Sequence, residues 1–203
     1  PFKQVYTLSI VIVGNFNPSI IQPFWFSSKR LIRDQEAQDA KVEVIHSELV
    51  KWSLDWMSIE ATKTRLEIRS SLEQYFGTIR DLLVGMLGIL KETPISAIGI
   101  NHLLYFAIPD EERYFEFGNK LVPLSNWKGI ISNPKMFLLD IGEDKRSDNY
   151  SGQYHVRVQP SDIKLSTPYG ILIYINDHFD FERKFDGNSE LIEMLNNYWD
   201  ISS

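Results

Sequence analysis

The strongest hydrophobic pattern in the chain lies between Ser70 and Glu92. Apolar residues recur there three and four positions apart, at Tyr75, Phe76, Ile79, Leu82, Leu83, Met86, Leu87 and Leu90. This spacing predicts an amphipathic helix of about five turns, with a serine pair capping its start. Thr93-Pro94 is expected to end the helix, because the residue before a proline is disfavoured in helical conformation. Gly85 and Gly88 lie among the apolar positions, so we expect a neighbouring segment to pack closely against them.

Before this helix the pattern changes to the alternation that is typical of β-strands. Residues 5–13 are apolar on both faces, which predicts a central strand. The aromatic turn Pro23-Phe24-Trp25-Phe26 is expected to lead into a helix over 27–40 that has a solvated face. Residues 41–69 alternate in four short runs, which predicts a four-stranded antiparallel meander with one wet face.

After Pro94 the order of elements begins again. We expect strands over 95–108, 136–141, 154–159 and 169–176, and helices over 111–121, 125–131 and 189–201. A charged loop is expected over 177–188. Both halves of the chain therefore follow the order strand, helix, three or four strands, long helix.

Together these elements predict a single α+β domain over residues 1–203, in which two long helices pack on one face of a curved antiparallel sheet. The halves, about 1–93 and 94–203, are interpreted as pseudo-repeats, with a chance alternation of elements as the alternative. The order of elements is similar to that of the helix-grip folds of the TATA-box-binding-protein type. An analogy between folds carries no function by itself.

Short strings spread over nearly the whole chain also carry a family resemblance. They are Asn15-Phe16-Asn17-Pro18, Pro23-Phe24-Trp25-Phe26 with Leu31-Ile32, Arg80-Asp81-Leu82-Leu83, Thr93-Pro94-Ile95 with Gly99-Ile100-Asn101, Trp127-Lys128-Gly129-Ile130, and Ile175-Asn176-Asp177-His178-Phe179. These strings resemble a group of uncharacterised prokaryotic conserved hypothetical proteins that occur sporadically in bacteria and archaea. The resemblance implies one continuous unit and no catalytic residue.

Composition restricts the function without identifying it. The chain has no cysteine, which excludes disulfides, cysteine zinc ligands and a thiol nucleophile, and which fits a cytoplasmic location. The formal net charge is -6, so a phosphate-binding surface would have to be local. No apolar run approaches the roughly 20 residues of a membrane helix. We therefore predict no membrane contact, and we assign no cofactor and no metal.

The densest polar cluster is Asn176-Asp177-His178-Phe179-Asp180. Asp177, His178 and Asp180 are weak candidates for metal binding or acid–base catalysis. A loop that uses Asn and Asp for turn formation is the favoured alternative, because no second histidine lies close in sequence. No phosphate loop, dinucleotide fingerprint or nucleophile elbow is present elsewhere. His46 and His102 fall on apolar faces, where partial burial is expected.

A second candidate site is the sheet face opposite the long helices. Arg65, Arg69, Arg157 and Tyr174 are predicted to lie there as binding residues. Basic residues among aromatics would suit a nucleic acid, but carboxylates share the face, so a solvated, salt-bridged surface is the alternative. Trp25 is a further binding candidate where the aromatic turn is exposed, with core packing as the alternative.

The sequence predicts a non-catalytic binding or assembly protein that contacts a protein partner or a second copy of itself. The absence of catalytic motifs and the large patterned core favour this interpretation over an enzyme. Two alternatives stay open. One is a metal-dependent hydrolytic enzyme centred on the loop from Asn176 to Asp180, and the other is a nucleic-acid-binding sheet, which the negative net charge disfavours.

Overall fold

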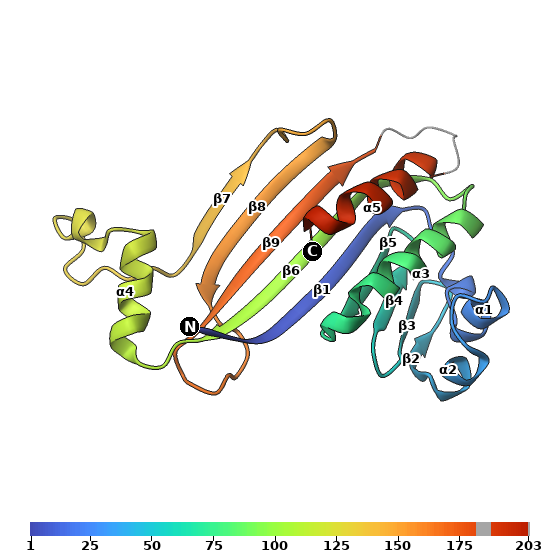
Figure 1. Cartoon of the computed structure of the whole chain (residues 1–203), viewed down its shortest axis with the longest axis horizontal. Coiled ribbons are helices and arrows are strands. Elements are labelled where there is room, and N and C mark those ends of the chain that lie inside the picture. Colours follow the sequence, from blue (N-terminus) through green and yellow to red (C-terminus); the bar gives the residue numbers. More distant parts are fainter. Residues whose placement is uncertain (182–187, 203) are drawn as a thin grey trace.

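A computed structural model of the chain describes residues 1–181 and 188–202, with side chains up to residue 199. Its centre is one open antiparallel sheet (Figure 1). The strands are β1 (Phe2–Gly14), β2 (Lys41–Ile45), β3 (Leu49–Ser53), β4 (Ser58–Thr62), β5 (Arg65–Ser70), β6 (Ile95–Ala107), β7 (Leu139–Glu143), β8 (Ser151–Pro160) and β9 (Gly170–Asp180). The helices are α1 (Pro23–Ser28), α2 (Asp34–Asp39), α3 (Phe76–Ile89), α4 (Glu111–Leu121) and α5 (Ser189–Ser202). The α+β class and the antiparallel sheet are confirmed.

The two longest strands, β1 and β6, pair at the middle of the sheet. The strand order is β2-β3-β4-β5-β1-β6-β9-β8-β7, so each half of the chain occupies its own side of the β1–β6 pair. Ile10 lies opposite Ile100 in this ladder, and Ser9 lies opposite Asn101. Because side chains alternate along a strand, the sheet has one apolar side and one largely polar side.

Helices α3 and α5 contact each other. Both helices contribute to one buried core, with Leu83 and Met86 from α3, Met194 and Leu195 from α5, and Ile10 from β1. Each such side chain stabilises the fold by about 1.5–3 kcal/mol when fully buried. None of the described helices is both long and apolar enough to cross a bilayer.

The first helical region differs from the prediction. The segment that was expected to be an aromatic turn is α1, because Pro23 occupies the first helical position, where its fixed φ and missing N–H are favourable. The expected single helix over 27–40 is wrong. Arg30 has φ of 59° and interrupts it, so a separate helix, α2, begins at Asp34. The predicted helix over 125–131 is only a 3₁₀ turn, Leu124–Trp127.

The predicted start of the long helix is also wrong. Ser70 ends β5, and its hydroxyl donates to the Trp56 carbonyl oxygen at 2.6 Å instead of capping a helix. A 3₁₀ turn, Glu73–Tyr75, leads into α3. The expected close packing is found at Gly85, where an added Cβ would lie 2.8 Å from Leu31 Cδ2. It is absent at Gly88, where no described atom other than the chain neighbours and the helix's own backbone lies within 4 Å of an added Cβ.

The polar cluster from Asn176 to Asp180 was expected in a loop but belongs to β9. Asp177 lies opposite Ile100 of β6 and Tyr154 of β8, so this part of the strand has ladder partners on both sides. Tertiary pairing therefore overrides the local turn preference of Asn and Asp. The expected burial of His46 is likewise wrong, because His46 is exposed directly after β2 (Lys41–Ile45), an edge strand of the sheet.

The two helix glycines give a matched test of packing. Gly88→Ala is expected to stabilise the protein by up to about 1 kcal/mol, because alanine lowers the conformational entropy cost of the helix without a clash. Gly85→Ala should gain less or lose stability, because Leu31 has to move. Urea unfolding of both variants measures the difference, and an equal gain in both would contradict the close Gly85–Leu31 contact.

Candidate interaction surfaces

The polar side of the sheet holds the residues that were predicted as binding residues. On β5, Arg65 and Arg69 lie on either side of Glu67, with Nη2 atoms 2.7 and 2.8 Å from its carboxylate oxygens. The Ser9 hydroxyl donates to the same carboxylate at 2.5 Å. Burial raises the pKa of Glu67, but the hydrogen bonds from Ser9 and Arg65 and the charge of Arg69 outweigh it, so the pKa lies below its usual value. Both arginines are therefore already paired.

Asn101 of β6 connects this pair of strands to the other half of the sheet. The Tyr174 hydroxyl and the Asn176 amide donate to Asn101 Oδ1 at 2.6 and 2.7 Å, and Asn101 Nδ2 donates to the Ser9 carbonyl oxygen at 3.0 Å. Gly99 leaves room for this contact, because an added Cβ would lie 3.2 Å from Asn176 Nδ2. Burial raises the pKa of Tyr174. A hydrogen-bonded network thus crosses the middle of the polar side.

A shallow groove of about 290 Å³ lies beside this network. It is lined by Asp140, Gln153, His155, Arg157, Tyr174, Asn176 and His178. Arg157 donates to Asp140 at 2.6 Å, and His178 Nε2 lies 3.1 Å from Asp180 Oδ1. The structure therefore brings the predicted residues Arg157 and Tyr174 together, whereas Arg65 and Arg69 lie beyond β1 and β6. The groove has charges of both signs, and they are paired with one another.

Asp177 points to the opposite side of the sheet from its neighbours His178 and Asp180. It is 3% exposed and accepts a hydrogen bond from Arg146, which is 7% exposed. Arg146 also contacts Asp148 at 2.6 Å, and its guanidinium lies 3.9 Å from the centre of the Phe179 ring. This cluster fixes the loop between β7 and β8 against the sheet.

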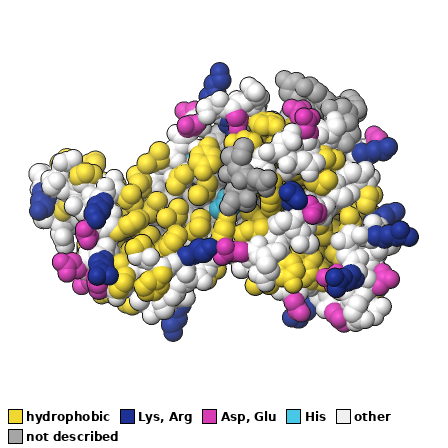
Figure 2. Space-filling view, in the orientation of Figure 1, with side chains coloured by type: hydrophobic (Ala, Val, Ile, Leu, Met, Phe, Trp, Pro, Cys, Tyr) yellow, Lys and Arg dark blue, Asp and Glu magenta, His cyan; other side chains and the backbone are white. Residues whose placement is uncertain are grey.

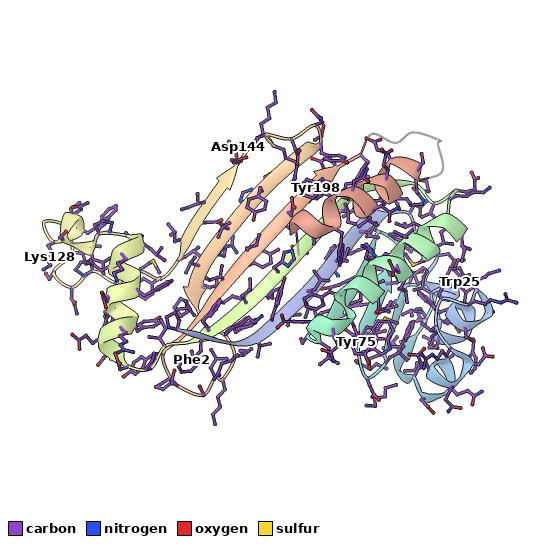
Figure 3. All side chains as sticks on the ribbon, in the orientation of Figure 1. Phe2, Trp25, Tyr75, Lys128, Asp144 and Tyr198 are labelled. Atoms are coloured by element: carbon purple, nitrogen blue, oxygen red, sulfur yellow. The ribbon has the colours of Figure 1, made fainter. Side chains whose placement is uncertain are left out.

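The same guanidinium donates to the Tyr198 hydroxyl of α5 at 2.9 Å, and Figure 3 shows Tyr198 on the helix above the sheet. The pKa of Arg146 lies above its usual value, because the hydrogen bonds to Asp148 and Asp177 outweigh the opposing effect of burial. Sequence reasoning missed Arg146, which lies in a charged segment with the composition of a solvated loop. Asp177 gave no signal of burial either, because it lies in the densest polar cluster of the chain, where a loop was expected.

The three weak catalytic candidates therefore do not converge. Asp177 is in a buried ion cluster beneath α5, and His178 pairs with Asp180 on the other side of the sheet. Over the described parts of the chain, no group of three or more His, Cys, Asp or Glu side chains is placed to hold a metal ion. The other predicted binding residue, Trp25, is half-buried in α1 and packs edge-on against Phe26.

The apolar side of the sheet is only partly covered. No described helix lies over the middle of β7 and β8 or the adjoining lengths of β9 and β6, and Figure 2 shows hydrophobic side chains gathered there. At one end of this surface, Tyr114 and Phe117 of α4 line a cavity with Ile171. Ile141 is 61% exposed and Tyr154 is 36% exposed. We name this surface the apolar face, and its members are Leu104, Phe106, Leu139, Ile141, Tyr154, Val156, Ile173 and Ile175. Their alternation with polar residues along β8 is visible in the sequence, but it does not show that this side of the strand is uncovered.

A second apolar surface lies on the segment that follows β6. Residues 111–138, which we name the α4 arm, project beyond one end of the sheet, and Lys128 lies near the arm's tip (Figure 3). Its exposed apolar residues include Ile130, at 82%, and Phe137, at 78%, with Phe115, Leu121, Trp127, Ile131 and Leu138 also exposed. The molecule therefore presents two separate apolar surfaces to solvent.

His102 is buried at the border of the apolar face. It is 4% exposed, its Nδ1 lies 2.7 Å from the Tyr6 hydroxyl, and its Nε2 has no hydrogen-bond partner among the described residues. Burial lowers the pKa of His102, and the nearby charge of Asp177 opposes this effect only in part. The neutral imidazole is therefore favoured in the folded protein.

Removal of the Arg146 guanidinium should be costly. Arg146→Ala is expected to lower the free energy of unfolding by about 3–5 kcal/mol, because it takes the cation from a buried carboxylate. The control is Arg157→Ala, whose exposed pair with Asp140 should contribute at most about 1 kcal/mol. Urea unfolding compares the two. Similar small losses in both variants would contradict the structural role of the Arg146 cluster.

His102 should make stability depend on pH. Its pKa is about 6.5 when unfolded and lower when folded, so the unfolded state binds the proton more readily. The free energy of unfolding should therefore fall as the pH drops below about 6.5 and continue to fall until the folded-state pKa is passed. His102→Gln should show a shallower decrease in thermal unfolding between pH 7 and pH 5. An identical pH profile in both proteins would contradict the neutral buried histidine.

Comparison with known proteins leaves the function to be argued from this geometry. No protein-family model matches the chain, and no curated protein matches it.

Proposed function

We propose that the chain is a non-catalytic assembly protein that uses the apolar face to contact a protein partner or a second copy of itself. The observation that carries this proposal is a continuous row of apolar residues across β6, β9, β8 and β7 that are half-buried on β6 and β9 and most exposed at Ile141 and Tyr154. Single exposed apolar side chains are common on soluble proteins, but contiguous patches mark interaction sites. Ile141 and Tyr154 lie at the most exposed part of this patch.

The alternatives have weaker support. A metal-dependent hydrolase centred on residues 176–180 is not favoured, because Asp177 and His178 point to opposite sides of the sheet. A nucleic-acid interface on the polar side is not favoured either, because Arg65, Arg69 and Arg157 are each paired with a carboxylate. The absence of cysteine supports a cytoplasmic location.

We also infer that the two halves are pseudo-repeats related by an approximate twofold axis near the Ile10–Ile100 pair, with α3 and α5 as equivalent helices on one face. The symmetric strand order around β1 and β6 supports this inference. So does the position of α3 after β5 and of α5 after β9. The pseudo-twofold arrangement agrees with the analogy to the TATA-box-binding-protein type of fold.

A charge placed on the apolar face tests the proposed function. Ile141→Lys should lower either the mass of a self-associated species in light scattering or the fluorescence of a bound hydrophobic dye, because it interrupts the patch. The matched control is Val42→Lys, on the opposite edge strand, where an exposed apolar residue also faces the helix side. Ile141→Lys has to fold like the wild type for this comparison. The proposal fails if this variant changes the mass and the dye fluorescence no more than Val42→Lys does.

A further inference from the structure

We propose that the partner is a second copy of this chain, and that the α4 arm of each copy covers the apolar face of the other in a twofold dimer. This inference rests on the proposed function and deepens it, because it names both the partner and the segment that docks. It starts from two largely exposed apolar surfaces on one chain, which meet only at one end of the sheet, where Tyr114 and Phe117 of the arm line a cavity with Ile171.

The α4 arm is amphipathic, and its charges are largely satisfied within the helix. Asp110 caps the helix by accepting from the Arg113 backbone N–H at 2.9 Å, and Lys120 pairs with Glu116 at 2.8 Å. Within α4, which is described in full, only Gly118 is buried. Ile130 and Phe137 remain 82% and 78% exposed, although one side of Phe137 lines a small cavity with Phe117 at the base of the arm.

The first half of the chain has a segment in the position that corresponds to the α4 arm. The segment after β1 forms α1 and α2, and it packs onto the sheet of its own half. Phe26 is fully buried with its ring 5.3 Å from that of Trp52, and the Trp52 indole N–H donates to the Ile21 carbonyl oxygen at 3.0 Å. The segment after β6 holds the corresponding place in the second half, but it projects away from the sheet (Figure 1). The apolar face is the surface that it leaves uncovered.

The size of the two surfaces favours a reciprocal contact. Four strands spaced by about 4.8 Å, each contributing about six residues at 3.4 Å per residue, make a face of about 400 Å². A stable dimer buries about 800 Å² per partner. One arm on one face falls short of this area, whereas a twofold dimer makes the contact twice, and each copy then buries both its face and its arm.

The absence of cysteine allows a direct test by site-specific cross-linking of the full chain. Ile130→Cys and Ile141→Cys copies carrying different tags are mixed and treated with a bismaleimide. We expect a cross-linked species that contains both tags, at a yield several-fold above that of the control mixture of Ile130→Cys with Val42→Cys. Val42 is exposed but lies on the far edge strand. Equal yields in the two mixtures would overturn the proposal.

Light scattering provides the second measurement. The wild-type chain should have twice its single-chain mass of 23.6 kDa, and Ile130→Lys should halve the observed mass. If Ile141→Lys dissociates the dimer but Ile130→Lys does not, the proposal that the α4 arm covers the apolar face of the other copy is overturned. The proposed function of the apolar face as a contact surface would still stand. If the wild-type chain is a monomer, the proposal that a second copy is the partner is overturned. The partner of the apolar face would then be a different protein. A third measurement uses the Ile130→Cys, Ile141→Cys double variant. A cross-link that forms only within one chain would show that the arm covers the apolar face of the same copy, which would overturn the proposal.

Discussion

The pairing of β1 with β6 is the constraint on which the rest of the structure depends. This ladder joins residues that lie about ninety positions apart, from Phe2 opposite Ala107 to Gly14 opposite Ile95. It places Ile10 and Ile100 in the core to which α3 and α5 contribute, and Ser9 and Asn101 on the other side of the sheet. The other strands extend the sheet from β1 through β5 and from β6 through β9. The register of the β1–β6 pair therefore sets which side of the whole sheet is apolar and which is polar.

Much of the fold could be predicted from the sequence because periodicity reports which side chains turn inward. The long strand after Pro94, the meander over 41–69 and the closing helix were all predicted on this basis. Local rules failed where tertiary contacts decide the outcome. The end of β9 keeps strand geometry despite its Asn and Asp residues because it pairs on both sides, and Ser70 hydrogen-bonds to Trp56 across the sheet instead of capping α3.

The candidate surfaces were less predictable, for two physical reasons. The Arg146–Asp177 pair joins residues from a loop and a strand that are 31 positions apart, and neither residue signals the other in the sequence. The apolar face has the sequence pattern of an ordinary core, because periodicity shows that Ile173 and Ile175 share one side of their strand but not whether anything covers them. By contrast, alternation alone was sufficient to place Arg157 and Tyr174 on the polar side.

The two sides of the sheet differ in what they would gain from a contact. On the polar side Glu67, Asn101 and Asp140 already have partners within the chain, so a binding partner would have to replace these interactions and desolvate paired charges. On the apolar side the Ile141 side chain contacts water, and covering it removes apolar surface from water without breaking a hydrogen bond. The free-energy balance of association therefore favours the apolar side, where β7 and β8 extend the sheet beyond the helices that cover its other half.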